Sequence, residues 1–440
     1  MKKLLKISAL ALVGLPILLS SCGNSGSGQL VGVQNRIQWY QPDPYGMLYL
    51  PMGSYNMGPS DQDVPYASTA KSKTVSVQAF YMDETEITNN EYRQFVHWVR
   101  DSIAHRIIGE EVDEEHLFMV DRYDQDYNTP HINWNSRIEW SEPEEREALE
   151  VMYYPEFERF KGRREMDGRK LDYEYFWIDY RDAARKGGSG APLRQRGMTD
   201  RSVFIKRDVI NVYPDTLVWV HDFTYSFNEP MTKMYFSHPA FDDYPVVGVT
   251  WKQARAFCIW RTDLLNNYLL KIGGVRVQDF RLPTESEWEY AARGGLDLAP
   301  FPWGGPYIRN TRGCFLANFK PMRGNYIDDG GFHTVPVSSY SPNDYGLYCM
   351  SGNVAEWTSN AYDESSYDFA HDLNMDYVYE ADEDDPPVLK RKVIRGGSWK
   401  DISYYLQTGT RTYEYQDTAK SYIGFRSVMS YLGRAKGDDI

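Results

Sequence analysis

The sequence has few of the patterns on which catalysis usually depends. Its eight histidines show no spacing typical of a metal site. It has no phosphate-binding loop, no dinucleotide fingerprint and no nucleophile elbow of the GxSxG type. A basic run is also absent and the net charge is −14, which together argue against nucleic acid as a partner.

Aromatic residues are abundant by contrast. They make up 15% of the chain, and tyrosine alone accounts for 35 residues. This composition favours a loop-rich fold in which phenol hydroxyls satisfy irregular backbone. A chain of 440 residues is long enough for one large domain with insertions, or for two domains.

The N-terminus is typical of a secretory signal peptide over residues 1–21. Three lysines precede an apolar run from Ile7 to Leu19, which is too short to span a bilayer comfortably. The run ends in the letters LSSC, so Cys22 is expected to be the lipidated first residue of a bacterial lipoprotein. An ordinary signal peptide with a chance cysteine is the alternative. Residues 22–45 then form the lipidated N-terminus and a polar tether. Removal of the three lysines changes the net charge from −14 to about −17.

Three further cysteines remain, Cys258, Cys314 and Cys349. A secreted protein can form disulfides, but an odd count leaves at least one thiol free. The sequence leaves two alternatives open, which are a Cys314–Cys349 bridge and three small buried residues.

Capping patterns predict three helices. Thr88 precedes a helix with Glu91 in the capping-box position, and the same pattern recurs at Thr250 and at Thr284. The third helix is expected to end at Gly294. It carries three glutamates, and we expect structural roles for them because no partner base for acid–base chemistry is evident.

Alternating patterns predict strands over 46–57, with a turn at 51–53, and over 74–80. Residues 101–243 interrupt the core pattern as a charged, tyrosine-rich insertion with a strand-like stretch over 203–223. Its tryptophans argue against disorder; they are Trp134, Trp140, Trp177 and Trp219. Partner contacts and simple covering of the core are equally supported roles for the insertion. A second addition is the acidic loop 363–387, also expected to contact partners.

The stretch from Arg395 to Arg426 organises the chain. It opens with RGGSW and closes with GFR. Its signature residues are Arg395, Gly396, Gly397, Trp399, Gly424, Phe425 and Arg426. Together with MGSYNMG, FYMDETEIT and FRLPTESEWEYAARGG, this signature resembles the formylglycine-generating enzyme (sulfatase-modifying factor) family. The resemblance implies an α+β, C-type-lectin-like fold over 46–100 plus 244–430.

The same resemblance implies that the family's chemistry is missing. In active members two thiols follow the RGGSW motif, and here Asp401 and Leu406 occupy those positions. Neither side chain serves as a thiolate nucleophile or as a soft-metal ligand. A catalytically inactive relative is therefore expected.

The family commonly holds two calcium ions, and oxygen donors from turns suit such a cation. Carried onto this chain, the first site comprises Asn318, Phe319, Asp329 and Phe332. The second comprises Gly352, Val354 and Glu356, with Cys349 where an asparagine is usual. The alternative is that these residues only close turns.

The lipoprotein signal, the insertion and the tract from Tyr40 to Ala67 resemble lipoproteins of the type IX secretion and gliding machinery of Bacteroidetes. That resemblance implies an anchor in the outer membrane on the periplasmic face, self-association in a ring, and a GldN/PorN-like ring partner. Two other functions are kept open, an active periplasmic thiol oxidase and a lectin-like glycan-binding module.

Overall fold

The computed structural model describes residues 41–59, 72–120, 125–179, 183, 201–226, 228–328, 330–371 and 375–433. Cys22, the signal peptide and Asp329 lie outside these residues. Residues Asp43–Gly433 form one compact unit by their contacts.

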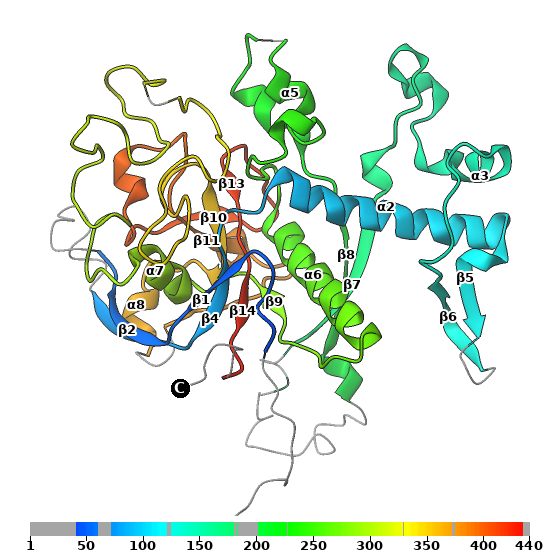
Figure 1. Ribbon diagram of the computed structural model, residues 1–440, viewed down its shortest axis with the longest axis horizontal. Helices are drawn as coiled ribbons and strands as arrows, with labels where there is room; N and C mark the ends of the chain where they lie inside the picture. Colours follow the sequence, from blue (N-terminus) through cyan, green and yellow to red (C-terminus); the bar gives the residue numbers. More distant parts are fainter. Residues whose placement is uncertain are drawn as a thin grey trace, which may run out of the picture. The chain divides into compact units, whose positions relative to one another are not determined.

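Helices and strands are mixed along the chain (Figure 1). The α-helices are α2 (Asn89–Glu111), α3 (Pro143–Ala148), α5 (Pro230–Met234), α6 (Trp251–Lys271), α7 (Glu285–Arg293) and α8 (Ser366–Phe369). The strands are β1 (Met47–Leu50), β2 (Gly53–Met57), β3 (Lys73–Val77), β4 (Phe80–Asp83), β5 (Leu117–Val120), β6 (Asp126–Ile132), β7 (Asp172–Ile178), β8 (Ile205–Asn211), β9 (Phe280–Arg281), β10 (Ala355–Ala361), β11 (Arg391–Arg395), β12 (Thr412–Tyr415), β13 (Ile423–Gly424) and β14 (Val428–Ser430). Short 3₁₀ turns, labelled η, join them.

Two four-stranded sheets form the centre of the domain. One has the order β1-β4-β14-β9 and the other β12-β11-β10-β13. All pairs are antiparallel except β10–β13, and the smaller ribbons β2–β3, β5–β6 and β7–β8 are antiparallel as well. Helices combined with largely antiparallel sheets agree with the α+β prediction. The predicted strand over 74–80 is split, because β3 pairs with β2 whereas β4 pairs with β1 and β14.

The three predicted capping boxes are all present. Thr88, Thr250 and Thr284 each accept a hydrogen bond from the backbone N–H three residues on, and the glutamate or glutamine there accepts one from the cap backbone. Gly294 ends α7 in the left-handed conformation, as predicted. Helices α2 and α6 then pack through buried rings, with Tyr92 and Phe257 stacked at 5.6 Å between centroids.

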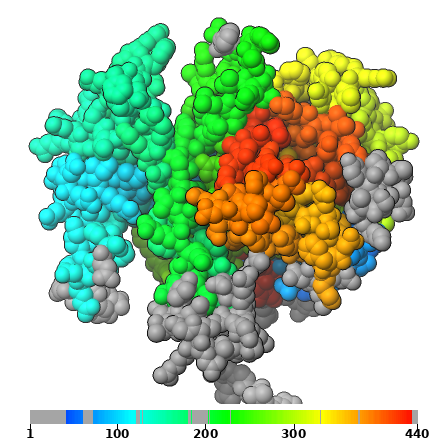
Figure 2. All heavy atoms as spheres, turned by 180° about the vertical axis from the view of Figure 1, so that it is seen from behind, coloured from blue at the N-terminus to red at the C-terminus, as the bar shows by residue number. Residues whose placement is uncertain are grey.

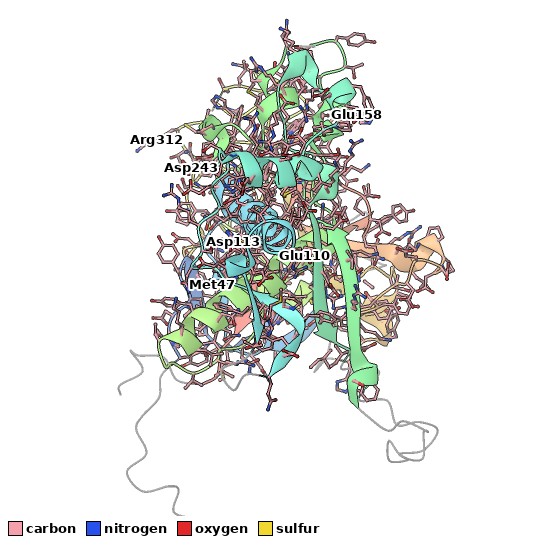
Figure 3. All side chains as sticks on the ribbon, turned by 90° about the vertical axis from the view of Figure 1, so that its right-hand side faces the viewer. Met47, Glu110, Asp113, Glu158, Asp243 and Arg312 are labelled. Atoms are coloured by element: carbon pink, nitrogen blue, oxygen red, sulfur yellow. The ribbon has the colours of Figure 1, made fainter. Side chains whose placement is uncertain are left out.

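The insertion is continuous with the core. Helix α2 runs past residue 100 to Glu111, and Figure 3 views it nearly end on with Glu110 and Asp113 close to its near end. Strand β7 buries Tyr173 and Tyr175 in the same core cluster as α2 and α6. The strand-like stretch 203–223 is strand only in β8, and residues 216–221 form the 3₁₀ turn η8 (Thr216–His221).

The tryptophans of the insertion differ in exposure. Trp134 is 46% exposed and stacks on Trp98 of α2. Trp140 and Trp177 are half-buried beneath arginine side chains. The rings of Trp140 and Trp177 thus pack partly within the chain, and partner contact through the insertion stays a prediction.

The acidic loop 363–387 is partly a core element. Tyr367 is 3% exposed, and Asp376 accepts hydrogen bonds from both the backbone N–H and the hydroxyl of Ser286 at the start of α7. Deleting the whole loop would therefore remove a buried tyrosine and the hydrogen bonds to the start of α7. Its exposed described residues are 364, 365, 368, 369, 371, 382–384, 386 and 387. Among the helices of the described residues, none has the length and apolarity required to cross a bilayer.

Candidate functional site

Arg395 lies at the end of β11 and is fully buried. Its guanidinium pairs with Glu289 at 2.7 Å and with Glu285 at 2.8 Å, both on α7. It also donates to the backbone oxygens of Thr408 and Thr410 at 3.0 and 3.1 Å. Arg395 therefore connects the start of the signature to helix α7 and to the signature loop that contains Thr408 and Thr410.

Two further arginines neutralise the same glutamates. Arg411 pairs with Glu285, and Arg293 pairs with Glu289 at 2.6 Å. Burial alone would raise the pKa of Glu285, but the charges of Arg411 and Arg395 outweigh it, so the pKa lies below its ordinary value. Charges fixed in this way stabilise a loop framework and leave no carboxyl free for proton transfer.

The third glutamate of α7 is structural too. Glu287 completes the capping box at Thr284 and accepts two hydrogen bonds of 2.6 Å from Arg281. The structural interpretation of the cluster is thus confirmed for all three glutamates. The sequence did not indicate Arg293 and Arg411, because nothing local distinguishes a buried arginine from an exposed one.

Arg426 closes the signature with a second buried ion pair. Its guanidinium donates to both carboxylate oxygens of Glu356 at 2.6 and 2.8 Å, and Trp288 Nε1 donates to one of them at 2.7 Å. Glu86 lies nearby, and its pKa is raised well above the ordinary value by burial and then by the charge of Glu356. Neither pattern nor spacing had indicated Glu86, which is fully buried and accepts from Asn353 and Val354.

The two positions expected to hold thiols have different surroundings. Asp401 is half-buried, and its carboxylate accepts a hydrogen bond of 2.6 Å from Ser398. Burial raises its pKa above the ordinary value. Leu406 is fully buried in an apolar cluster with Phe301, Phe315 and Phe319. Neither position offers a thiol.

All three cysteines of the described residues are free. The Cys314–Cys349 bridge is absent, because Cys314 is exposed whereas Cys349 is buried and donates to the Val337 oxygen. The alternative of three buried cysteines is wrong for Cys314. Burial raises the pKa of Cys258 to about 12, so this thiol is not a ready nucleophile.

The first candidate calcium loop brings some of its residues together. Asn318 is buried, its amide group donates to the His333 oxygen at 2.6 Å, and its side-chain oxygen faces Gly331. Phe319 is buried and Phe332 is 55% exposed. Because Asn318 keeps its side-chain oxygen out of that hydrogen bond, the residues present are compatible with a hard cation there.

The second candidate loop fits calcium less well. Gly352 and Val354 lie in the turn before β10, but the Glu356 carboxylate is already held by Arg426 and Trp288. An arginine on both carboxylate oxygens competes with a metal for the same lone pairs. Within the described ranges no group of three or more histidine, cysteine or acidic side chains is arranged for a metal.

The insertion reaches the signature loop. Trp219 of η8 stacks on Trp399 with ring centroids 5.9 Å apart. Asp222, which follows η8, pairs with Lys400 and accepts a hydrogen bond from Ser421. The signature therefore packs against elements that lie far away in sequence.

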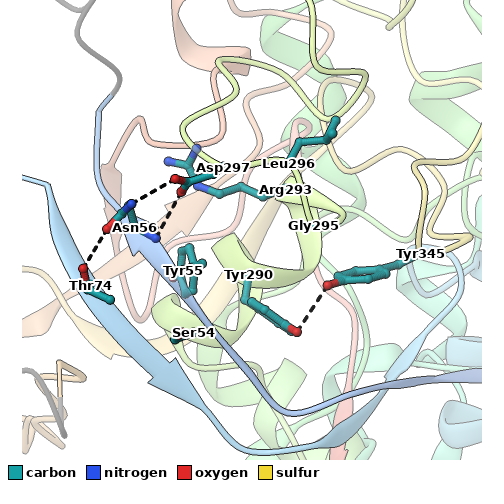
Figure 4. A pocket seen from close by; sticks show the side chains of 10 residues that line it. All are labelled: Ser54, Tyr55, Asn56, Thr74, Tyr290, Arg293, Gly295, Leu296, Asp297 and Tyr345. Atoms are coloured by element: carbon teal, nitrogen blue, oxygen red, sulfur yellow. Dashed lines mark hydrogen bonds between the residues drawn. The ribbon is translucent and has the colours of Figure 1, made fainter.

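Two pockets were not indicated by the sequence. The first, about 400 Å³, lies beside β2 and the end of α7 (Figure 4). Its polar groups bond one another, as in Asn56 to Asp297 at 3.0 Å and Tyr345 to Tyr290 at 3.2 Å. The second, about 390 Å³, is lined by Pro300, Phe301, Pro306, Tyr307, Ile308, Ser403, Tyr404 and Gln407. Neither brings a nucleophile and a base together.

Buried arginine–glutamate pairs thus hold a long loop against a domain of mixed helices and sheets, and positions 401 and 406 carry no thiol. The family model for the sulfatase-modifying factor enzyme 1-like domain matches residues 38–431. The chain therefore belongs to this family.

Curated relatives include both inactive and active members. The inactive C-alpha-formylglycine-generating enzyme 2 of Bos taurus is 34% identical over 203 residues, covering 44% of this chain and 53% of that protein. The formylglycine-generating enzyme of Bos taurus is 33% identical over 197 residues, which cover 43% of this chain and 45% of that protein. The chain thus spans about half the length of these relatives. Among solved structures, PvdO from Pseudomonas aeruginosa aligns with a TM-score of 0.45 and 16% identity, over 87% of this chain and 94% of that chain.

Proposed function

We propose that this protein is a catalytically inactive relative of the formylglycine-generating enzymes. Its role would be that of a structural outer-membrane lipoprotein of the type IX secretion and gliding machinery, of the kind called GldK or PorK. In this role it forms a periplasmic ring with a GldN/PorN-like partner. The C-type-lectin-like character of the fold is part of the same proposal.

The observation that carries the proposal is the loss of both thiol positions. Asp401 is held by Ser398, and Leu406 is packed among phenylalanines. A domain of this family that keeps its buried arginine framework without these two thiols retains the fold but lacks the thiol nucleophile of active members. The existence of curated relatives called inactive supports this interpretation, although active members match at similar identity.

The activity test uses the full chain with copper, oxygen and a cysteine-containing sulfatase peptide. We expect no formylglycine by mass spectrometry. The control is a variant in which Cys258, Cys314 and Cys349 are all replaced by alanine. Turnover by the wild type that the variant loses would establish the alternative, a periplasmic thiol oxidase, and turnover that persists in the variant would reveal a thiol-independent site.

Anchoring at Cys22 is proposed from the LSSC tract and the polar residues after it. Replacing Cys22 by alanine should release the protein from outer-membrane fractions, because acyl chains contribute about 0.8 kcal/mol per buried CH₂. A variant that stays in the membrane and incorporates radiolabelled palmitate would place the anchor elsewhere. Ser21→Ala is the matched control.

Calcium binding is proposed at the first loop, around Asn318. Added calcium should raise the unfolding temperature of the wild type, and Asn318→Ala should abolish that shift. A shift of equal size in wild type and variant would exclude this loop.

A further inference from the structure

Residues 156–163 of the insertion form an exposed tip that differs in charge from the rest of the molecule. Phe157 is 86% exposed and Phe160 is 68% exposed. Lys161 and Arg163 lie exposed beside them. Two large apolar side chains together with two cations are unusual on a chain with 62 acidic and 48 basic residues. Aromatic residues and arginine are the types that binding surfaces favour.

The base of this tip is fixed. Tyr154 N–H donates to the Glu165 oxygen at 3.0 Å, and Arg159 and Arg164 both pair with Glu150. One carboxylate thus holds two arginines, so this group keeps one net positive charge. Among the described residues, however, no carboxylate pairs with Lys161 or Arg163. The tip therefore offers unpaired positive charge on a preformed loop. Of its two exposed acids, Glu158 is paired with Arg169 and Glu156 is not.

The acidic loop carries the complementary surface. Asp382, Glu383 and Asp384 are exposed, and no lysine or arginine of the described residues pairs with their carboxylates. Val388, 57% exposed, lies just beyond them. We call Asp382, Glu383, Asp384 and Val388 the acidic ledge.

The ledge is also held in shape. The Asp385 carboxylate accepts from Tyr379 and from the backbone of residue 382 at 3.0 and 2.9 Å, and Lys390 donates to the Glu383 oxygen at 2.6 Å. Two preformed surfaces lose little conformational entropy on meeting, which favours their association.

Tip and ledge do not meet within one molecule. In Figure 2 the teal surface of the insertion is separated from the orange surface of the acidic loop by the green elements between them. Figure 3 shows Glu158, within the tip, well above Glu110 and Asp113 at the end of α2. A contact between unlike patches of two copies is head-to-tail, and it closes into a ring when the rotation between copies permits.

We propose that the tip of one copy docks on the acidic ledge of a second copy. This rests on the proposed function, in which copies of the chain associate. The contact buries Phe157 and Phe160 against Val388, while Lys161 and Arg163 face the three ledge carboxylates. Such a contact weakens as salt rises, because exposed charges are screened over about 8 Å at physiological ionic strength.

The test compares self-association of the full chain in detergent by analytical ultracentrifugation. One variant reverses the tip, with Lys161→Glu and Arg163→Glu. Another reverses the ledge, with Asp382→Lys, Glu383→Lys and Asp384→Lys. Each alone should weaken association at least about tenfold. An equimolar mixture of the two should restore it, because each reversed surface then finds its complement on the other variant.

Matched controls change the same charge elsewhere. Arg312→Glu with Lys320→Glu matches the tip variant, and Glu110→Lys with Glu111→Lys and Glu114→Lys matches the ledge variant; these side chains are exposed. The controls should associate as the wild type does. A third variant, Phe157→Ser with Phe160→Ser, should weaken association without changing net charge.

The outcomes separate this interface from the wider function. If the wild type assembles and either reversal assembles equally well, or if the mixture fails to restore assembly, the interface is overturned and the scaffold function stands. A tip variant that loses only binding to anionic phosphatidylglycerol vesicles identifies a lipid surface and overturns the interface as well. A wild type that stays monomeric and partner-free at cellular concentration overturns both proposals.

Discussion

The pair between Arg426 and Glu356 gives the most direct test of how the signature holds the fold. The Arg426 side chain is fully buried, and it makes hydrogen bonds to both oxygens of Glu356 and to the Tyr348 backbone oxygen at 2.9 Å. Replacing Arg426 by methionine fills similar space but removes every one of these donors. Only Trp288 then still donates to the buried carboxylate.

The expected cost follows from leaving a charge buried without its partner. Breaking such a pair by removing one member typically costs about 3–5 kcal/mol. Glu86 adds to the cost, because Arg426 is the charge that offsets its repulsion from Glu356. The Arg426→Met variant should therefore unfold at clearly lower urea concentration, with an unchanged slope of the free energy of unfolding against urea.

A double variant tests the cause. Glu356→Gln combined with Arg426→Met removes both charges and keeps an acceptor for Trp288, so it should be more stable than Arg426→Met alone. Urea unfolding followed by circular dichroism measures both. Arg137→Met is the control, since Arg137 is 86% exposed in its pair with Glu139 and should matter little. The reasoning is refuted if Arg426→Met costs less than about 1 kcal/mol or if the double variant is no better.

Three further outcomes are expected. Iodoacetamide at pH 8 should label the exposed Cys314 and spare Cys258, whose pKa is raised to about 12 by burial; mass spectrometry that finds the reverse contradicts the structure. Burial, and secondly the nearby His116, lower the pKa of His105 from its ordinary value of 6.5. The folded state therefore holds His105 neutral, and the stability from this residue is present above pH 6.5 and is lost as the pH falls below it. The protection factors of the amide hydrogens over residues 105–116, corrected for the intrinsic pH dependence of exchange, should therefore fall between pH 7 and pH 5. Unchanged protection factors would disprove this coupling. Gly352→Ala should destabilise the protein by about 2 kcal/mol or more. The φ angle of Gly352 is +80°, and a Cβ there would lie 2.4 Å from the backbone oxygen of Asn318. A urea midpoint equal to that of the wild type would refute this prediction.

Local sequence patterns were enough to predict where the helices of the core begin. Thr88, Thr250 and Thr284 each carry their capping partner three residues on, so the start of each helix is determined by neighbours in sequence. The end of α7 at Gly294 is local in the same sense. Such features need no knowledge of tertiary contacts.

Ion pairs between residues far apart in the chain could not be predicted from the sequence. Arg395 finds its carboxylates more than 100 residues earlier, on α7, and Arg411 joins them there. The burial of Tyr367 within a loop that is acidic and tyrosine-rich gave no local sign. For the same reason Glu356 was predicted as a metal ligand, whereas its partner in the fold is Arg426, 70 residues further along the chain.

The loss of the thiols is more than two isolated substitutions. Leu406 fills an apolar cluster with three phenylalanines, so a cysteine there would be buried, and burial disfavours the thiolate that the chemistry requires. Asp401 lies next to Lys400, which is paired with Asp222 of the insertion. The insertion and the family fold are therefore packed together beside Asp401. The proposed contact surfaces, the tip and the ledge, lie on segments added to that fold, so the assembly variants change residues outside the buried ion pairs of the signature.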